Sequence, residues 1–261
     1  PYTLEARIAS RCQLPSGAVC VTNGATEAIY LIAQTFRGTN TAILQPTFSE
    51  YADACRIHGH RVSSLYQLPK EQDGYRLPDD VRMLWLCNPN NPTGTVAGKE
   101  YMRGLIEHNP QVCFIIDQSY EFFTLCPLFS PAEAAEYPNV LLLHSMTKRY
   151  AIPGLRLGYV TGSSGLLERL RTNRMPWSVN RLAIEAGLFL LENDVPEPLD
   201  VAAYLQETAR LGKALKAVGG LDVWDTQTHF MLVQLRMGKA SALKEYLARE
   251  HGILIRDASN F

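Results

Sequence analysis

Ser145-Met146-Thr147-Lys148 is the stretch that decides how this chain of 261 residues is interpreted. An apolar run at 140–143 precedes it, separated only by His144, and Arg156 stands eight positions after the lysine. One lysine is thus accompanied by two hydroxyls and a guanidinium, which are donors that bind phosphate. The stretch therefore predicts a nucleophilic lysine beside an anion site.

Further polar groups precede this stretch in an informative order. Asn91 lies in a segment rich in asparagine and proline at 88–94, and Asp117 ends the apolar run 114–116. An asparagine, an acid, a lysine and an arginine are the groups needed to hold pyridoxal 5'-phosphate (PLP), with the lysine forming a Schiff base and the acid facing the ring nitrogen. At these residues the chain resembles the fold type I PLP-dependent aminotransferase family.

The resemblance implies a role for each of these side chains. Lys148 would carry PLP and then move a proton at the substrate α-carbon, and Asp117 would pair with the protonated ring nitrogen. Asn91 and Tyr120 would hydrogen-bond the 3'-oxygen of the ring. Phe48 would stack on the ring face, where relatives more often have Tyr or Trp. The expected catalytic residues are therefore Lys148, Asp117 and Tyr120.

A phosphate site is expected at a helix start. The segment Gly24, Ala25, Thr26 follows a predicted strand and opens a predicted helix, so its free N–H groups and the helix dipole favour an anion. Without the other residues, Thr26 could simply be an N-cap. In the family pattern, this segment binds the cofactor phosphate together with three later side chains, namely Ser145, Thr147 and Arg156.

Only two residues of this sequence are expected to bind the substrate. Arg256 matches a family arginine near substrate anions, although an exposed arginine on an edge strand is the alternative. Asn180 is the second expected substrate-binding residue. In relatives an arm precedes the position of Pro1 and a further arginine follows that of Phe261, so we expect both ends of the fold to be incomplete. The resemblance also implies a homodimer, because in this family the site is completed across the subunit interface.

The apolar pattern predicts an α/β fold with a mainly parallel sheet sandwiched by helices. Buried parallel strands appear as continuous apolar runs, and runs of this kind alternate with helical patterns. The predicted strands are 18–22, 41–44, 83–87, 112–117, 140–144 and 157–161, and the first helices are 26–36 and 48–58.

After Asn180 the pattern changes, which predicts a second, smaller α+β domain. Long helical patterns at 182–191 and 200–218 precede predicted strands at 221–224, 230–234 and 253–256, with a helix at 240–250. Pro196 and Pro198 mark the approach to the long helix. We expect a PLP-binding large domain over 1–185 and a C-terminal small domain over 186–261.

Composition restricts the class of protein. A formal charge of -1 gives no electrostatic reason to expect nucleic acid or membrane as a partner, and the apolar runs are too short to span a bilayer, so a cytoplasmic enzyme is expected. The six cysteines form no Cys-x-x-Cys pair, which favours free thiols. His58 and His60 have no second cluster nearby, so we expect them at the surface or in a turn and expect no metal site.

The reaction is the least determined feature. Within the family the closest resemblance is to the histidinol-phosphate aminotransferases and the L-threonine O-3-phosphate decarboxylases. The stretches at 46–51, 147–154 and 175–180 favour the decarboxylases, which act in cobalamin biosynthesis. We therefore expect a carboxy-lyase that converts L-threonine O-3-phosphate to 1-amino-2-propanol phosphate. The alternatives are an aminotransferase that uses 2-oxoglutarate and a noncatalytic PLP-binding sensor domain.

Overall fold

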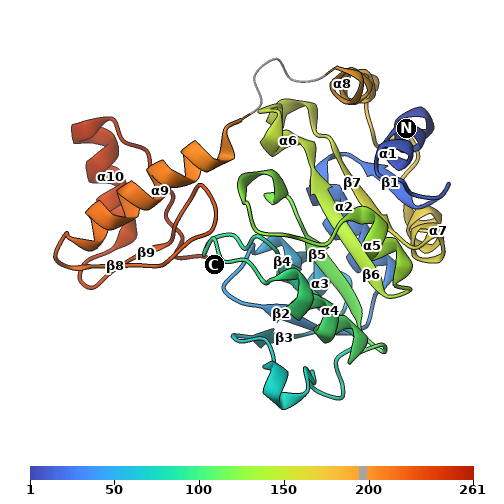
Figure 1. Cartoon of the computed structure of the whole chain (residues 1–261), viewed down its shortest axis with the longest axis horizontal. Helices are drawn as coiled ribbons and strands as arrows, with labels where there is room; N and C mark the ends of the chain where they lie inside the picture. Colours follow the sequence, from blue (N-terminus) through green and yellow to red (C-terminus); the bar gives the residue numbers. More distant parts are fainter. Residues whose placement is uncertain (194–198) are drawn as a thin grey trace.

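The computed structural model describes residues 1–193 and 199–261, and it consists of a large part built on a seven-stranded sheet and a smaller part built on a two-stranded sheet (Figure 1). The large sheet confirms the predicted α/β class, and its strand count includes one strand that the pattern missed, β3. Across the sheet the strands lie in the order β1 (Val19–Thr22), β7 (Gly158–Gly162), β6 (Val140–Ser145), β5 (Cys113–Asp117), β4 (Met83–Cys87), β2 (Asn40–Leu44) and β3 (Arg61–Leu65).

Strand direction explains where polar side chains collect. Strands β3, β2, β4, β5 and β6 are parallel, whereas β7 runs antiparallel to both β6 and β1. The carboxyl ends of the parallel strands and of β1 therefore share one edge of the sheet, and β7 begins there, with Gly158 paired to Ser145. In α/β sheets this edge is the usual place for a ligand site.

Helices cover both faces of the sheet, as the alternation of side chains along the strands requires. In β4, Trp85 packs into a cluster with α2 (Gly24–Thr35), α3 (Glu50–Ile57) and α7 (Ser164–Asn173). Its neighbours Leu84 and Leu86 face the opposite cluster, with α4 (Lys99–Glu107) and α5 (Pro131–Glu136). Two further helices, α1 (Tyr2–Arg11) and α8 (Arg181–Glu192), pack beside β1. This layering makes the sheet a rigid platform for its carboxyl edge.

The smaller part contains α9 (Val201–Lys216), β8 (Leu221–Val223), β9 (Val233–Leu235) and α10 (Ala240–His251). At 16 residues α9 is the longest helix described, and no helix of the described residues is long and apolar enough to cross a membrane. The boundary expected at 185–186 falls within α8, and the division into two domains stays a prediction. Pro196 and Pro198 lie outside the described residues.

The strand predicted at 253–256 is wrong. The chain is irregular there, and Leu254 is 81% exposed. A strand needs a neighbour to complete its hydrogen bonds, but in the described part of the chain β8 and β9 pair only with each other. The Ile253 N–H instead donates to the Leu247 carbonyl and closes the end of α10.

The placement expected for His60 is also wrong. Its ring is buried and bonded at both nitrogens, with Nδ1 2.7 Å from Thr41 Oγ1 and Nε2 2.8 Å from the Ala33 carbonyl oxygen. Burial lowers the pKa of His60, which favours the neutral ring. This histidine joins β2 to α2 and so has a structural part in the core.

Candidate active site

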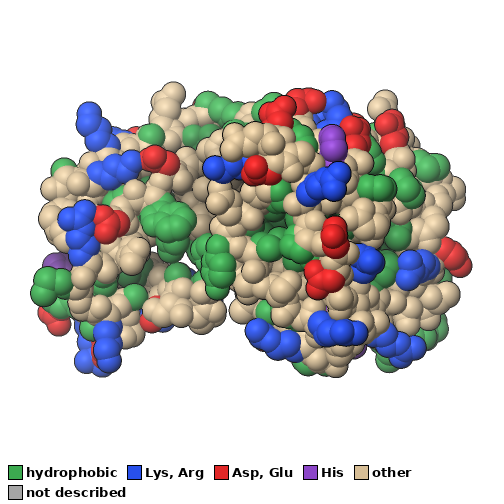
Figure 2. Space-filling view, turned by 90° about the horizontal axis from the view of Figure 1, so that it is seen from below, with side chains coloured by type: hydrophobic (Ala, Val, Ile, Leu, Met, Phe, Trp, Pro, Cys, Tyr) green, Lys and Arg blue, Asp and Glu red, His purple; other side chains and the backbone are tan. Residues whose placement is uncertain are grey.

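A cleft of about 1360 Å³ lies where the carboxyl edge of the large sheet meets the smaller part. In the view from below, the two parts stand on either side of a recess with hydrophobic side chains on its walls (Figure 2). Most residues predicted for the site line this cleft: Ala25, Thr26, Phe48, Asn91, Asp117, Tyr120, Ser145, Thr147, Lys148, Arg156 and Arg256. Residues that lie far apart in the chain are thus brought to one place.

Lys148 projects from α6 (Met146–Arg149), a single turn that begins directly after β6. Its side chain is exposed to the cleft, with Nζ 5.7 Å from the centre of the Tyr120 ring. The next residue, Arg149, turns away and places its guanidinium 3.9 Å from the centre of the Phe122 ring. Of the two adjacent cations, only the lysine is available to a ligand in the cleft.

The expected anion site is assembled from the end of β6, the turn α6, the loop before β7 and the start of α2. Ser145 Oγ and Thr147 Oγ1 lie 2.8 Å apart, and Arg156 has a left-handed backbone with φ of 56°. Gly24 does not line the cleft itself. A Cβ added there would lie 2.6 Å from Arg156 Nη2, so the glycine lets the guanidinium lie against the helix start. Two hydroxyls, a guanidinium and free helix N–H groups form a donor set that fits a phosphate.

Gly158 is required for the same approach. A Cβ at this position would lie 2.7 Å from the Ala25 nitrogen and 2.9 Å from the His144 carbonyl oxygen, and both are backbone atoms. We expect Gly158→Ala to cost about 1–3 kcal/mol of folding free energy through overpacking, and to weaken PLP binding because the start of α2 must move. Urea unfolding and PLP titration test both effects.

Gly165→Ala is the matched control, since nothing lies within 4 Å of the added methyl and the site is helical. This variant should be as stable as the parent or slightly more so. An unchanged unfolding midpoint and PLP affinity in Gly158→Ala would contradict the proposed packing at the phosphate site.

Asp117 is buried at the end of β5 and receives one hydrogen bond on each carboxylate oxygen. The Tyr51 hydroxyl donates to Oδ2 at 2.8 Å, and the Ser119 N–H donates to Oδ1 at 2.8 Å. Each oxygen keeps a further lone pair, because a carboxylate can accept about four hydrogen bonds. A buried carboxylate at the cleft wall is able to accept a hydrogen bond from a protonated ring nitrogen.

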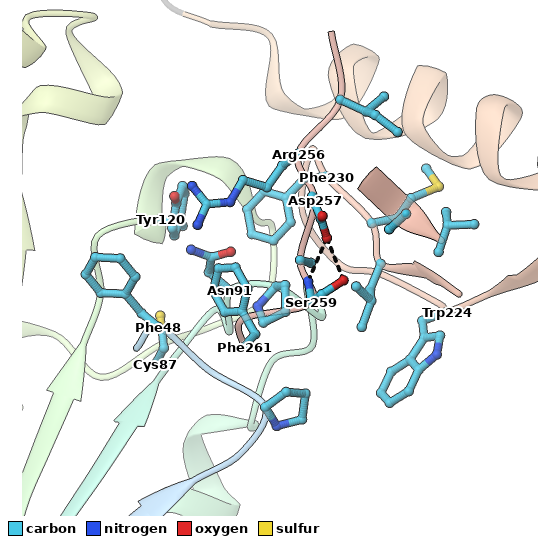
Figure 3. A pocket seen from close by; sticks show the side chains of 18 of the residues that line it. Phe48, Cys87, Asn91, Tyr120, Trp224, Phe230, Arg256, Asp257, Ser259 and Phe261 are labelled. Carbon is cyan, nitrogen blue, oxygen red and sulfur yellow. Dashed lines mark hydrogen bonds between the residues drawn. The ribbon is translucent and has the colours of Figure 1, made fainter. Parts of the chain in front are cut away.

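Tyr120, Asn91 and Phe48 line the same cleft as Asp117, and Figure 3 shows these three side chains at one end of it. Burial raises the pKa of Tyr120 to about 12, and the nearby Cys87 and Asp117 add to the effect. The phenol therefore remains a hydrogen-bond donor at neutral pH. Phe230 from the smaller part contacts the Tyr120 ring edge, with ring centres 5.0 Å apart.

Arg256 reaches the cleft from the smaller part and points toward Tyr120 (Figure 3). Its guanidinium lies 5.4 Å from the centre of the Phe261 ring. The following loop is held by Asp257, whose Oδ1 accepts hydrogen bonds from the N–H and hydroxyl of Ser259. Arg256 thus provides a second cationic group in the cleft, separate from Arg156, on an irregular segment rather than a strand.

The structure does not bring Asn180 into the cleft. Its Oδ1 accepts from the Ala183 N–H and caps α8, while its Nδ2 donates to the Leu155 carbonyl oxygen at 3.1 Å. Both polar groups are therefore engaged beside the loop that carries Arg156. In this arrangement Asn180 holds the loop to the start of α8, and its role toward a substrate stays a prediction.

Sequence reasoning missed several residues of the cleft, chiefly Tyr51, Phe230 and Phe261. It also missed the contact between the two parts, where the Gln227 N–H donates to the Gly94 carbonyl and the Val96 N–H donates to Gln227 Oε1, both at 2.8 Å. Tyr51 lies one helical turn from Phe48, and that spacing was the available signal. Phe230 and Phe261 carry no local pattern that points to a site.

Comparisons with known proteins agree with this geometry. The family model described as aminotransferase class I and II matches residues 2–261. The chain is 30% identical to threonine-phosphate decarboxylase of Salmonella typhimurium and 29% identical to histidinol-phosphate aminotransferase of Lactiplantibacillus plantarum, covering 100% and 97% of this chain and 73% of each relative. The crystal structure of L-threonine-O-3-phosphate decarboxylase from Porphyromonas gingivalis superposes with a TM-score of 0.94 at 37% identity, over 100% of this chain and 79% of that one.

Proposed function

The chain belongs to the aminotransferase class I and II family, whose members are PLP-dependent enzymes, and from this premise we propose that it decarboxylates L-threonine O-3-phosphate to 1-amino-2-propanol phosphate. In that reaction the bond between the α-carbon and the carboxylate breaks, carbon dioxide leaves, and one proton returns to the α-carbon. PLP bound in the cleft would supply the electron sink for this bond cleavage.

The side chains of the cleft divide into two groups under this proposal. On the cofactor side, Lys148 would hold PLP covalently and move the proton at the α-carbon, and Asp117 would keep the ring nitrogen protonated. The start of α2 and the side chains of Ser145, Thr147 and Arg156 would hold the cofactor phosphate. Tyr120 and Asn91 would orient the cofactor ring. On the substrate side, Arg256 would bind an anionic group of the substrate.

The observation that supports decarboxylation best is the likeness to the Porphyromonas gingivalis decarboxylase over the whole of this chain. The cleft is consistent with a phosphorylated substrate, because Arg256 adds a second guanidinium to the cleft besides Arg156. A planar guanidinium is well suited to bind phosphate or carboxylate through two parallel hydrogen bonds.

The deciding experiment measures carbon dioxide released from L-threonine O-3-phosphate by the full-length protein with PLP and no keto acid, together with the amine product. Equal amounts of carbon dioxide and amine are expected. If neither forms although the absorbance of bound PLP changes on adding the amino acid, the decarboxylase proposal is overturned.

Transamination is the second candidate, because the histidinol-phosphate aminotransferase relative is almost as similar in sequence as the decarboxylase relative. Both substrates carry a phosphate, so Arg256 does not separate them. Histidinol phosphate has no carboxylate to lose. Conversion of 2-oxoglutarate to glutamate with histidinol phosphate, in the absence of carbon dioxide release, would favour this candidate.

A homodimer is part of the proposal, and exposed apolar side chains in the connection from α7 to α8 and at the start of α8 support it. Trp177 is 99% exposed, and Met175 and Leu182 are also largely exposed. The neighbouring Arg174 packs over the ring of Tyr2, another exposed aromatic, at 5.8 Å. A group of exposed apolar side chains of this kind is typical of a surface that another chain covers.

We expect Trp177→Glu to dissociate the dimer, because a carboxylate would be buried without a partner at the interface. Sedimentation velocity should give the mass of two chains for the parent and of one chain for the variant. Tyr66→Glu changes another highly exposed aromatic residue, which lies far from Trp177 in the sequence. This variant should leave the mass unchanged. A parent that sediments as one chain, or a dimer that survives Trp177→Glu, would contradict this interface.

A further inference from the structure

Tyr51 is a completely buried side chain that links two residues of the candidate site. Its ring stacks on Trp85, with ring centres 5.2 Å apart and planes 22° apart. It also meets Phe48 at an angle of 84°, with ring centres 5.8 Å apart. Its hydroxyl donates to Asp117 Oδ2 at 2.8 Å. One tyrosine therefore contacts both the carboxylate expected at the cofactor nitrogen and the aromatic expected at the ring face.

The Tyr51 hydroxyl acts as the hydrogen-bond donor in its contact with Asp117. Burial raises the pKa of Tyr51 well above its usual value, and the Asp117 carboxylate raises it further. Tyr51 therefore stays protonated and donates to the carboxylate. Such hydrogen bonds to an ionised acceptor are stronger than those between neutral groups.

The carboxylate is held from two directions. Tyr51 in α3 donates to one oxygen, and the backbone N–H of Ser119 after β5 donates to the other. Rotation of the carboxylate would break both bonds at a buried site, where an unsatisfied polar group is costly. The Tyr51 hydroxyl therefore selects one orientation of Asp117 toward the cleft.

We propose that Tyr51 is a positioning residue for the cofactor, which fixes the plane of the Asp117 carboxylate through its hydroxyl and supports Phe48 through its ring. The proposal rests on the placement of PLP over Asp117, but it does not depend on whether the enzyme decarboxylates or transaminates. Tyr51 acts through Asp117 and Phe48 and has no direct part in the reaction of the substrate. Residues that orient a metal-ligating side chain change affinity or activity by about 10- to 100-fold when removed, and we expect the same scale for a residue that orients Asp117.

The chain offers a matched control in Tyr30. Its hydroxyl donates to Glu50 Oε2, also at 2.8 Å, and neither residue lines the cleft. Tyr30→Phe and Tyr51→Phe therefore each remove one bond from a tyrosine to a carboxylate. Only the second change alters a group that faces the cofactor.

The test begins with PLP titration of each apoprotein and a pH titration of the absorbance of the bound cofactor, both without substrate. For Tyr51→Phe we expect the Kd for PLP to rise about tenfold or more and the pH dependence of the absorbance to change, because the carboxylate loses its fixed orientation. Tyr30→Phe should match the parent. With L-threonine O-3-phosphate, kcat of Tyr51→Phe should fall more than KM rises.

A Tyr51→Phe variant with parent values for PLP affinity and for the absorbance titration would overturn the inference. If this variant does not fold, 3-fluorotyrosine at position 51 retains the hydroxyl and makes it a stronger donor. The absorbance titration should then shift, and an unchanged titration would overturn the inference equally. Absence of decarboxylation in a parent protein with normal PLP binding counts against the proposed reaction and leaves the role of Tyr51 intact.

Discussion

Replacing Lys148 with alanine is expected to abolish turnover while leaving PLP bound. The variant loses both the covalent link to the cofactor and the amine that moves the proton at the α-carbon, and a loss of about 10⁴-fold or more is the expected scale for removing such a group. The phosphate site and Asp117 do not depend on the lysine side chain, so the cofactor should remain bound without a covalent bond. Carbon dioxide release, amine formation and retention of PLP after dialysis are the measurements.

Borohydride reduction followed by mass spectrometry gives a second readout for the same variant. The parent should gain the mass of the reduced cofactor on the peptide that contains Lys148, and the variant should gain none. Arg149→Ala is the control, because its guanidinium packs on Phe122 and lies outside the cleft. Retained turnover in Lys148→Ala, or labelling of another lysine, would reject the assignment.

The sequence was sufficient to predict the large sheet apart from its edge strand β3, because the signals of the other strands are local and strong. Buried parallel strands are continuous apolar runs, and Asp117 and Ser145 each end such a run. Once those strands are parallel, their carboxyl ends must share an edge, so Lys148 and Asp117 could be expected to meet. That step needs only the direction of the strands and the lengths of their connections.

The contacts that the sequence could not reveal depend on tertiary packing. Tyr51 belongs to an ordinary amphipathic helix, and only the docking of α3 on the sheet brings its hydroxyl to Asp117. The apolar residues at 253–255 resemble a strand, but a strand forms only where a neighbour is available. Asn180 has a side chain suited to a ligand, and its use as a helix cap is decided by where α8 begins.

The Asp117→Asn substitution is expected to have the second-largest effect, since it removes the charge that keeps the cofactor ring protonated. At about 4 Å and an effective dielectric constant near 20, a carboxylate stabilises a ring cation by about 4 kcal/mol. At about 1.4 kcal/mol for each tenfold change, turnover should fall roughly 10³-fold. The asparagine also turns an N–H₂ group toward the Tyr51 hydroxyl or the Ser119 N–H, both of which are donors, so the side chain cannot accept from both neighbours as the carboxylate does.

Asp53→Asn separates this effect from a general loss of charge, because Asp53 is an exposed residue of α3 paired with Arg56. It should leave turnover unchanged, since an exposed ion pair contributes about 0–1 kcal/mol to stability. The ring charge can be followed through the absorbance of bound PLP as a function of pH, because it changes the titration of the conjugated cofactor. In Asp117→Asn the ring nitrogen should lose its proton at a lower pH than in the parent, because the neutral amide no longer stabilises the cation. An unchanged absorbance titration combined with full turnover would mean that the ring nitrogen faces another group, and both the assignment of Asp117 and the positioning role of Tyr51 would then fail together.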